Sequence, residues 1–268
     1  MNKLNPIDIQ KAFQGPANLL QIEIHDTVTS TNDVIKSLFQ KYPDHISLVA
    51  TNEQTAGRGR SGKHFYSELK EGLYFSLAFQ PNTDNLANVP LYTLLAGAAL
   101  GKTLEKYLDE PIAIKWVNDI FYKRKKVIGI LSEMITPVEK DQARGVVVGI
   151  GINFAGNFSG TDDAIQTVAG TLFGETVPTD FSQSEFLGEF ITQFLAYHEQ
   201  FEQKAFMPYY EQHLLGKGKE VYYTVNGESK NGVIAGINEH GHLLIDQADG
   251  STDVLYGQEV HFGSQQFI

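Results

Sequence analysis

The chain contains no cysteine, which excludes disulfide bridges, thiolate nucleophiles and cysteine-ligated metal sites. It also lacks an apolar run long enough to cross a membrane, because the longest candidate, Leu91 to Leu100, is interrupted by Tyr92, Thr93 and Gly97. The first ten residues have neither the cationic start nor the apolar centre of a signal peptide. We therefore expect a cytoplasmic protein with no membrane partner.

Positive charge is scarce as well. Lysine and arginine number 21 against 32 aspartates and glutamates, so the formal net charge is −11. This balance argues against general affinity for the phosphate backbone of nucleic acid, although a local basic patch is compatible with an acidic chain. The clearest basic cluster is Lys123-Arg124-Lys125-Lys126. We interpret its first three residues as a solvated hairpin turn.

The chain does have enough apolar residues for a sizeable core. Hydrophobic residues make up 42% and charged residues 20% of 268 residues, which is ordinary for a globular protein with one large domain, or one large and one small. Hydrophobic periodicity predicts helices at 5–13, at 90–108, and at 182–215 with a break at Pro208. A further helix is predicted to begin after the N-cap candidates at 29–32. Strands are predicted at 21–28, 47–51, 72–79, 112–116, 119–122, 127–134 and 146–152.

The pattern changes near Gly216. From Gly218 to Phe262 short strands follow one another, with predicted turns at Asn226-Gly227, Asn231-Gly232, His240-Gly241 and Asp249-Gly250. About 45 residues of this kind favour a small β-barrel over an extension of the first sheet. We predict an α+β fold with a domain over residues 1–216, in which helices flank a mixed sheet, and a small barrel over 217–268.

Two segments in the first part of the chain could bind a ligand. Ser30-Thr31-Asn32 lies at a helix start, where such residues are N-caps far more often than ligands. In Gly57-Arg58-Gly59-Arg60-Ser61-Gly62, glycines could bring backbone N–H groups to an anion that guanidinium groups neutralise. A flexible surface loop is an equal alternative for this second segment, which matches neither a P-loop nor a dinucleotide fingerprint.

Two further segments lie in predicted strands. Lys115 and Asp119 bracket a strand junction, and the short turn that follows should return Lys126 toward Asp119. Two cations around one carboxylate suit ATP-dependent adenylation, whereas each pair alone could be an ordinary surface ion pair. In the segment 149–154, glycines alternate with isoleucines, so no side chain covers the backbone at the glycines. That space could accept a ligand or allow tight strand–helix packing. Asn153 lies at the end of the predicted strand.

In this order and at these spacings, the four segments resemble the biotin protein ligase family, from about Ile24 to the C-terminus. The resemblance implies a catalytic domain of the biotin/lipoate ligase type followed by an SH3-like barrel. It implies two reactions: biotin and ATP give biotinyl-5′-AMP with Mg²⁺, and the adenylate then biotinylates a carrier lysine. The partner would be the biotin carboxyl carrier domain of acetyl-CoA carboxylase or pyruvate carboxylase.

The resemblance also implies roles for individual residues. Polar groups hydrogen-bond the ureido ring of biotin, and the loop arginines close over its carboxylate and the activated phosphate. The implied biotin-binding residues are Ser30, Thr31, Asn32, Gln54, Arg58, Gly59, Arg60 and Lys126. The implied ATP-binding residues are Arg58, Arg60, Phe65, Lys115, Asn118 and Asn153. Catalytic roles are implied for Lys126, Arg60, Asp119 and Lys115, with Asp119 as the Mg²⁺ ligand or a group that positions the incoming lysine.

The sequence departs from the family pattern at three positions. Val117 replaces the usual proline, Phe65 a common tryptophan, and Ser61 a frequent arginine. Some family members carry an N-terminal helix-turn-helix module, but only about 20 residues precede the first predicted strand here, so we expect no DNA binding by that route. The resemblance leaves a homodimer open.

Two other functions compete with this interpretation. A lipoate or octanoate ligase would share the adenylate chemistry but would want a hydrophobic slot, so Ser30, Thr31, Asn32 and Gln54 favour biotin. A non-catalytic biotin sensor or carrier-docking protein would be expected to lack Lys126, Arg60 or Asp119, and all three are present.

Overall fold

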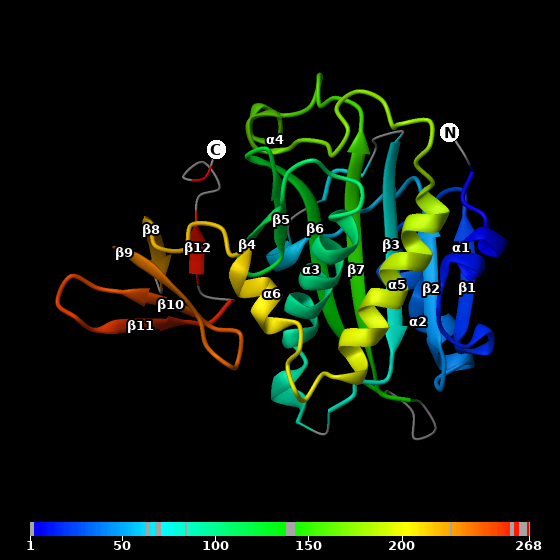
Figure 1. Cartoon of the computed structure of the whole chain (residues 1–268), viewed down its shortest axis with the longest axis horizontal. Coiled ribbons are helices and arrows are strands. Elements are labelled where there is room, and N and C mark those ends of the chain that lie inside the picture. Colours follow the sequence, from blue (N-terminus) through cyan, green and yellow to red (C-terminus); the bar gives the residue numbers. More distant parts are fainter. Residues whose placement is uncertain are drawn as a thin grey trace.

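The computed structural model describes residues 3–62, 65–67, 71–83, 85–137, 143–225, 227–257, 260–262 and 267. Its largest feature is a seven-stranded sheet in the order β1-β2-β3-β7-β6-β5-β4 (Figure 1). The strands are β1 Leu20–His25, β2 Ile46–Thr51, β3 Glu71–Phe79, β4 Ala113–Lys115, β5 Asp119–Tyr122, β6 Lys125–Ile135 and β7 Gly145–Ala155. Only β1 and β2 run parallel, so the sheet is mixed, as predicted.

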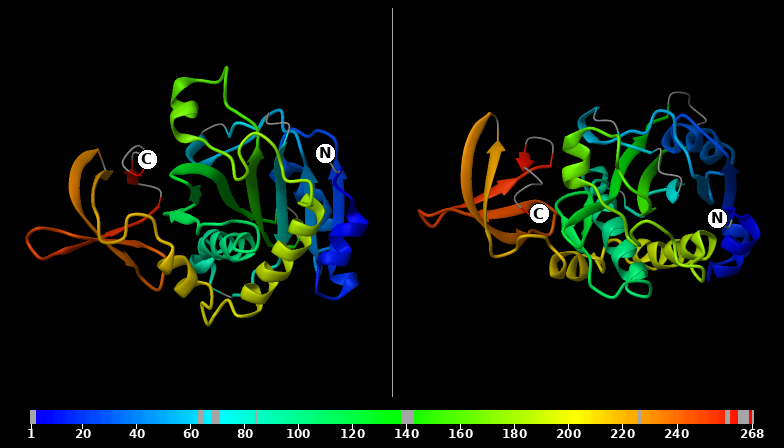
Figure 2. Two further views of the ribbon diagram at one scale, coloured as in Figure 1. Left: turned by 45° about the horizontal axis from the view of Figure 1, so that its top comes forward. Right: turned by 90° about the horizontal axis from the view of Figure 1, so that it is seen from above.

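Helices cover both faces of this sheet (Figures 1 and 2). They are α1 Pro6–Ala12, α2 Thr31–Lys41, α3 Leu91–Leu104, α4 Asp163–Val168, α5 Gln183–Glu199 and α6 Met207–Gln212, with short 3-10 turns at Ala17–Leu19, Arg60–Gly62 and Leu86–Asn88. On one face α3 and α5 pack together over the sheet, and α1 packs against α5. On the other face α2 packs against β2, β3 and β7. The face covered by α2 carries the candidate site.

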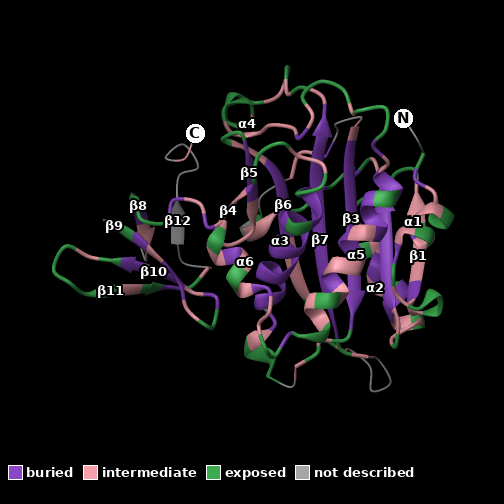
Figure 3. Cartoon of the chain, in the orientation of Figure 1, coloured by how far each residue is buried: buried purple, intermediate pink, exposed green. Residues whose placement is uncertain are grey.

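The adjacent strands β3 and β7 are buried along nearly their whole length (Figure 3). Side chains alternate between faces in a strand, so residues two apart share a face. Ile150 and Ile152 of β7 belong to the main core under α3 and α5, whereas Val147 belongs to the smaller cluster under α2. Gly149 and Gly151 therefore face the α2 side. The alternation of glycine with isoleucine makes one strand serve both the core and the site.

A second sheet follows near the C-terminus. It contains β8 Glu220–Val225, β9 Glu228–Ile237, β10 Leu243–Asp246, β11 Thr252–Leu255 and β12 Val260–Phe262, all antiparallel, in the order β11-β10-β9-β8-β12. This arrangement agrees with the small barrel-like unit that the turn spacing predicted. The boundary between residues 216 and 217 stays a prediction.

Three local predictions need correction. Asn231 and Gly232 lie inside β9 and form no turn; a Cβ on Gly232 would lie 2.5 Å from Ile245 Cγ2, so this glycine permits close packing between strands. The break in the long helical segment precedes Pro208, because α5 ends at Glu199 and Pro208 lies in the first turn of α6, where proline is tolerated. The turn after β5 uses only Lys123 and Arg124. Asn226, half of another predicted turn, lies outside the described residues.

Within the described part of the chain, no helix combines the length and apolar character that a bilayer span requires.

Candidate active site

Four polar side chains are buried together where α2 begins, on the α2 face of the sheet. They are Thr31, Asn32, Gln54 and Ser76. Gln54 Oε1 accepts hydrogen bonds from the Thr31 backbone N–H at 2.8 Å and from its hydroxyl at 3.3 Å. Ser76 Oγ lies 2.8 Å from Thr31 Oγ1 and 2.6 Å from Asn32 Oδ1. Buried polar groups are costly unless paired, so this cluster holds its side chains in one arrangement.

Gly149 provides the space for this cluster. A Cβ at position 149 would lie 2.0 Å from Asn32 Oδ1, far inside van der Waals contact. Ser30 is the N-cap residue of α2, but its side chain makes no capping hydrogen bond. It is buried at 3% exposure beside the cluster. The three predicted residues at the helix start are thus placed together with Gln54.

The segment Gly57 to Gly62 is called the glycine-arginine loop. The residues just before this loop are hydrogen-bonded to the residues just before α2. Backbone N–H groups of Thr55 and Ala56 donate to the carbonyls of Val28 and Thr29 at 2.9 Å. Phe65 N–H then donates to Gly57 O at 3.0 Å, which closes the loop. Residues 63 and 64 lie outside the described part.

The Phe65 ring lies over a pair of glycines in the sheet. Gly129 of β6 and Gly151 of β7 are cross-strand partners, and a Cβ on either would come within 2.7 Å and 2.5 Å of the ring. The bare backbone predicted for this run is therefore covered by two side chains of the chain itself, Asn32 over Gly149 and Phe65 over Gly151.

The two loop arginines point to different partners. Arg58 pairs with Asp33 of α2 at 2.8 Å and with Glu133 of β6 at 3.1 Å. Arg60 donates to Asn118 Oδ1 at 3.2 Å and to the carbonyl of Gly257 in the second sheet region. Burial lowers the pKa of Arg60, an effect that Asp119 partly offsets, and the guanidinium remains charged at neutral pH.

Of the predicted site with two lysines around one carboxylate, the structure shows the pair of Lys126 with Asp119. Lys126 Nζ lies 2.7 Å from Asp119 Oδ1, in a pair whose side chains are 28% and 17% exposed. Asp119 is also the cross-strand partner of Lys115 across the β4–β5 hairpin and of Gly129 in β6. Lys126 Nζ is 5.9 Å from the centroid of the Phe65 ring, so the ion pair adjoins the loop.

The segment between Lys115 and Asp119 is pinned from three sides. Trp116 Nε1 donates to Gly241 O of the second sheet at 2.8 Å. Tyr210 donates to Val117 O at 3.1 Å, and burial raises the pKa of this hydroxyl, which stays a neutral donor. Asn118 Nδ2 donates to Ile130 O at 3.0 Å. The Trp116–Val117 peptide bond is cis.

Asn153, at the end of β7, retains an unused acceptor. Its Nδ2 donates to Gly170 O at 3.2 Å, while its buried Oδ1 has no protein donor among the described residues. Residues 156–174, which include α4, hold this end of the sheet through Gly170 N–H to Lys126 O and Leu172 N–H to Asn153 O. An orphaned buried acceptor suits a ligand that brings an N–H group.

Four residues of the site had no specific contact or role assigned to them from the sequence. They are Ser76, Gly149 as the seat of Asn32, Glu133 and the Gly257 carbonyl. Ser76 alternates with core residues in a strand and carries no local signal. Gly257 lies almost 200 residues from its partner.

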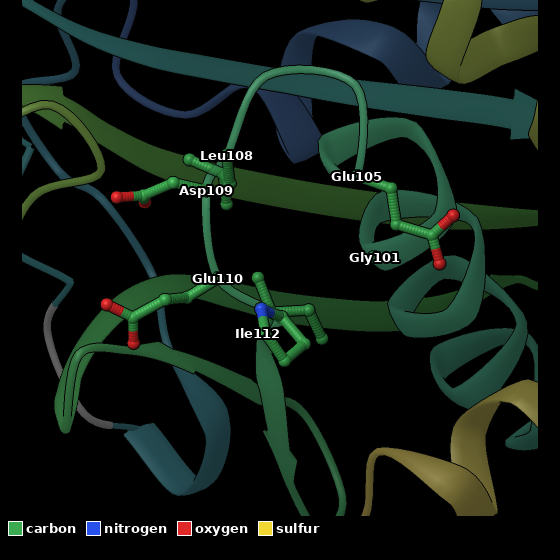
Figure 4. Close-up of a pocket in the computed structure, with 7 residues that line it drawn as sticks. Gly101, Glu105, Leu108, Asp109, Glu110 and Ile112 are labelled. Atoms are coloured by element: carbon green, nitrogen blue, oxygen red, sulfur yellow. The ribbon is translucent and has the colours of Figure 1, made fainter.

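A surface hollow of about 160 Å³ lies elsewhere, at the end of α3 (Figure 4). Its lining includes Glu105, Asp109 and Glu110, but none of the predicted site residues. Lys102 pairs with Glu105, and Lys123 lies 3.4 Å from Asp109 and 3.8 Å from Glu110. These carboxylates therefore already have cationic partners, and the hollow is separate from the candidate site.

The glycine-bearing face of the mixed sheet combines a buried polar cluster, a glycine-arginine loop and a lysine–aspartate pair. Fixed charges beside a polar pocket suit an enzyme that activates a carboxylate group for transfer. Residues 24–153 match the Biotin/lipoate A/B protein ligase family. Among curated proteins, it is 29% identical over 265 residues to the bifunctional ligase/repressor BirA of Bacillus subtilis, covering 97% of this chain and 80% of that protein.

Two more comparisons agree. The chain is 29% identical to the biotin–[acetyl-CoA-carboxylase] ligase of Paracoccus denitrificans, over 80% of this chain and 90% of that protein. The biotin protein ligase of Aquifex aeolicus, solved in complex with biotin and ATP, matches with a TM-score of 0.70 and 28% identity, over 91% of this chain and 99% of that one.

Proposed function

We propose that this chain is a biotin protein ligase that forms biotinyl-5′-AMP from biotin and ATP and transfers biotin to a lysine of a carrier domain. The observation that carries the proposal is that several of the predicted chemical groups lie along one face of the sheet. Asn32 lies over Gly149, Phe65 over Gly151, and Lys126 and Asp119 beside Gly129. The family match and the likeness to ligases with biotin and ATP support this conclusion.

In the first step, a carboxylate oxygen of biotin attacks the α-phosphorus of ATP, and pyrophosphate leaves. In the second step, the carrier lysine amine attacks the acyl carbon of the mixed anhydride, loses a proton, and expels AMP. Neither step requires a covalent bond to the enzyme, in keeping with the absence of cysteine. Catalysis then depends on positioning and on fixed charges.

The polar cluster would take the ureido ring, which is neutral and carries both donors and an acceptor. We assign ring recognition to Ser30, Thr31, Asn32 and Gln54. Gln54 Oε1 is occupied by Thr31, so the amide nitrogen of Gln54 is the group that would donate to the ring oxygen. A hydrophobic lipoyl chain would leave these groups unpaired, and that cost favours biotin over lipoate.

The reacting atoms would lie beside the loop and the ion pair. Lys126 and Arg60 would neutralise charge at the biotin carboxylate and the α-phosphate, with loop backbone at Gly59 nearby. Lys115 and Asn118 would contact the phosphates, Phe65 would stack on adenine, and Asn153 Oδ1 would accept from it. Arg58 belongs to this set by resemblance, although its two carboxylate partners, Asp33 and Glu133, favour a structural role.

Asp119 is the residue that fits Mg²⁺. No group of three metal-ligating side chains occurs among the described residues, and Mg²⁺ in nucleotide sites is usually held by one or two carboxylates together with phosphates and water. When bound, the ion would supply positive charge to the phosphates. For the acceptor we propose a biotin carboxyl carrier domain of acetyl-CoA carboxylase or pyruvate carboxylase, and for the location the cytoplasm. The absence of DNA and membrane partners stays a prediction, and a homodimer stays open.

The test uses the purified chain with Mg-ATP and biotin, lipoate or octanoate in separate reactions. We expect pyrophosphate release and an acyl-adenylate with biotin alone, and biotin transfer when a carrier domain is added. Adenylate formed with lipoate or octanoate but not with biotin would overturn the proposal in favour of a lipoate-type ligase. Biotin binding without pyrophosphate release would indicate a sensor.

A further inference from the structure

Glu133 contacts the buried polar cluster and has no role in the two proposed reaction steps. It lies in β6 on the same face as Gly129 and the candidate site, with a side chain 30% exposed. One of its oxygens, Oε2, accepts from Asn32 Nδ2 at 2.9 Å and from Arg58 Nη2 at 3.1 Å. Glu133 therefore joins the glycine-arginine loop directly to the proposed ring-binding residues.

The amide of Asn32 has two distinguishable ends, and its surroundings select one orientation. A carboxylate can only accept hydrogen bonds, so Glu133 requires the nitrogen end of the Asn32 amide. Ser76 Oγ, 2.6 Å from Oδ1, supplies a donor to the oxygen end. Because Asn32 is only 3% exposed, water cannot easily replace either partner.

The contacts of Asn32 continue toward Gln54. Ser76 Oγ also lies 2.8 Å from Thr31 Oγ1, and the Thr31 backbone N–H donates to Gln54 Oε1 at 2.8 Å. A continuous chain of hydrogen bonds thus runs from Arg58 through Glu133, Asn32, Ser76 and Thr31 to Gln54. Any change in the Asn32 amide would alter the donors and acceptors offered to a ligand along this chain.

Arg58 has the geometry of an anchor in this arrangement. Its Nη2 is shared between Asp33 and Glu133, and Asp33 also lies 3.7 Å from Lys36. Two carboxylates beside one guanidinium group leave Arg58 less available to phosphate than Arg60, whose hydrogen bonds among the described residues go to neutral oxygens of Asn118 and Gly257.

We propose that Glu133 is a positioning residue that sets the amide orientation of Asn32 for recognition of the ureido ring, and that Arg58 holds Glu133 in place instead of binding phosphate. This inference rests on the proposed function. It assigns part of the specificity for biotin to a carboxylate that never touches the ligand.

The test compares two carboxylates that contact the same arginine. Glu133→Gln replaces a group that can only accept by an amide that can also donate. The strongest contact that orients the Asn32 amide is then lost, and the longer one to the Leu131 carbonyl, at 3.5 Å, remains. We expect KM for biotin to rise about tenfold, the effect of one lost hydrogen bond, with kcat and KM for ATP within about twofold of wild type. Asp33→Asn is the matched control, because Asp33 contacts Arg58 but not Asn32, and KM for biotin should stay within about twofold.

A second variant covers a failure of Glu133→Gln to fold. Glu133→Asp keeps the charge for Arg58 but withdraws the carboxylate by about 1.5 Å, one carbon–carbon bond, so KM for biotin should rise similarly. Thermal unfolding of each variant identifies those that are folded. Equal KM for biotin in the folded Glu133 variants and Asp33→Asn would overturn the inference. So would an increase confined to KM for ATP. Wild-type protein that makes no biotinyl-5′-AMP would instead overturn the proposed function.

Discussion

Gly149 shows how one missing side chain can determine a polar site. Its backbone lies under the amide of Asn32, which is one of the four buried polar side chains of the cluster. The same alternation places Ile150 and Ile152 in the main core. At the residue scale, therefore, the isoleucines of β7 stabilise the core on one face, and its glycines make room for the candidate site on the other.

We predict that Gly149→Ala raises KM for biotin about tenfold or more, because the new Cβ, 2.0 Å from Asn32 Oδ1, must displace that amide. Steady-state kinetics with biotin as the varied substrate measure the effect. Gly97→Ala in α3 is the matched control: its Cβ would lie 3.5 Å from Tyr210, an ordinary contact, and alanine favours the helix by up to about 1 kcal/mol. Unchanged KM for biotin in Gly149→Ala would remove Asn32 from the binding site.

Lys126 is the second test at this scale. Lys126→Ala removes the cation 2.7 Å from Asp119, and we expect adenylate formation to fall on the order of 10²-fold or more. The loss of a half-buried ion pair should cost modest stability, which urea unfolding would report. Lys123→Gln, at the exposed tip of the same hairpin, is the control and should retain activity. Near-normal turnover in Lys126→Ala would show that the lysine has no part in activation.

At the scale of elements, Arg60 connects three of them. From the loop it reaches Asn118 at the start of β5 and the carbonyl of Gly257 after β11. The loop is thereby fixed at its base by α2 and at its tip by the second sheet. This suits a clamp that closes over an intermediate and excludes water from it.

We predict that Arg60→Gly leaves the first step largely intact but releases biotinyl-5′-AMP about ten- to hundredfold faster, since a charge-assisted contact is lost. The freed anhydride should label exposed lysines of added albumin, detected by blotting for biotin. Arg124→Gly, an arginine in the β5–β6 turn at φ 64°, is the matched control and should label no more than wild type. If Arg60→Gly makes adenylate without extra labelling, Arg58 or the loop backbone must retain the intermediate.

At the scale of the whole molecule, the partly buried His198 links the helical layer to the sheet. His198 at the end of α5 bonds to the Tyr92 hydroxyl of α3 at 3.1 Å, and its carbonyl accepts from Asn82 at 2.9 Å. It packs edge-on against Phe79 of β3. Burial lowers the pKa of His198 to about 4, so the folded protein keeps it neutral through most of the acidic range.

The sign of the resulting pH dependence follows from linkage. The unfolded chain binds a proton at its ordinary pKa of about 6.5 and the folded chain only near 4, so stability falls as the pH drops between these values. We expect a loss of about 2 kcal/mol in the free energy of unfolding between pH 7 and pH 5, measured with urea. His198→Gln should remove most of this loss, whereas His240→Gln, at an exposed turn, should not. Equal pH dependence in wild type and His198→Gln would contradict the assignment.

Much of this architecture could be predicted from local sequence. The strands from β1 to β7 and the helices α1, α2 and α3 have periodicities that match their environments, because each buries one face, or both, against neighbours. The convergence of Lys126 with Asp119 was also predictable, since a two-residue turn between short strands leaves little freedom. The turn predicted at Asn231-Gly232 was wrong because the local sequence does not distinguish a glycine in a turn from one in a strand. Only the close packing of Ile245 against Gly232 shows that this glycine belongs to a strand.

The sequence by itself determined that the protein has a mixed α+β core, a separate terminal run of short strands, no thiol chemistry, and motifs typical of a biotin-activating ligase. Only the tertiary structure decided which residues act together. Glu133 and Asn32 are about 100 positions apart, and Arg60 and Gly257 almost 200, so no periodicity or motif could pair them. Such contacts arise when sheet order and packing bring distant segments together, and a side chain then bonds to whichever group that packing leaves unsatisfied.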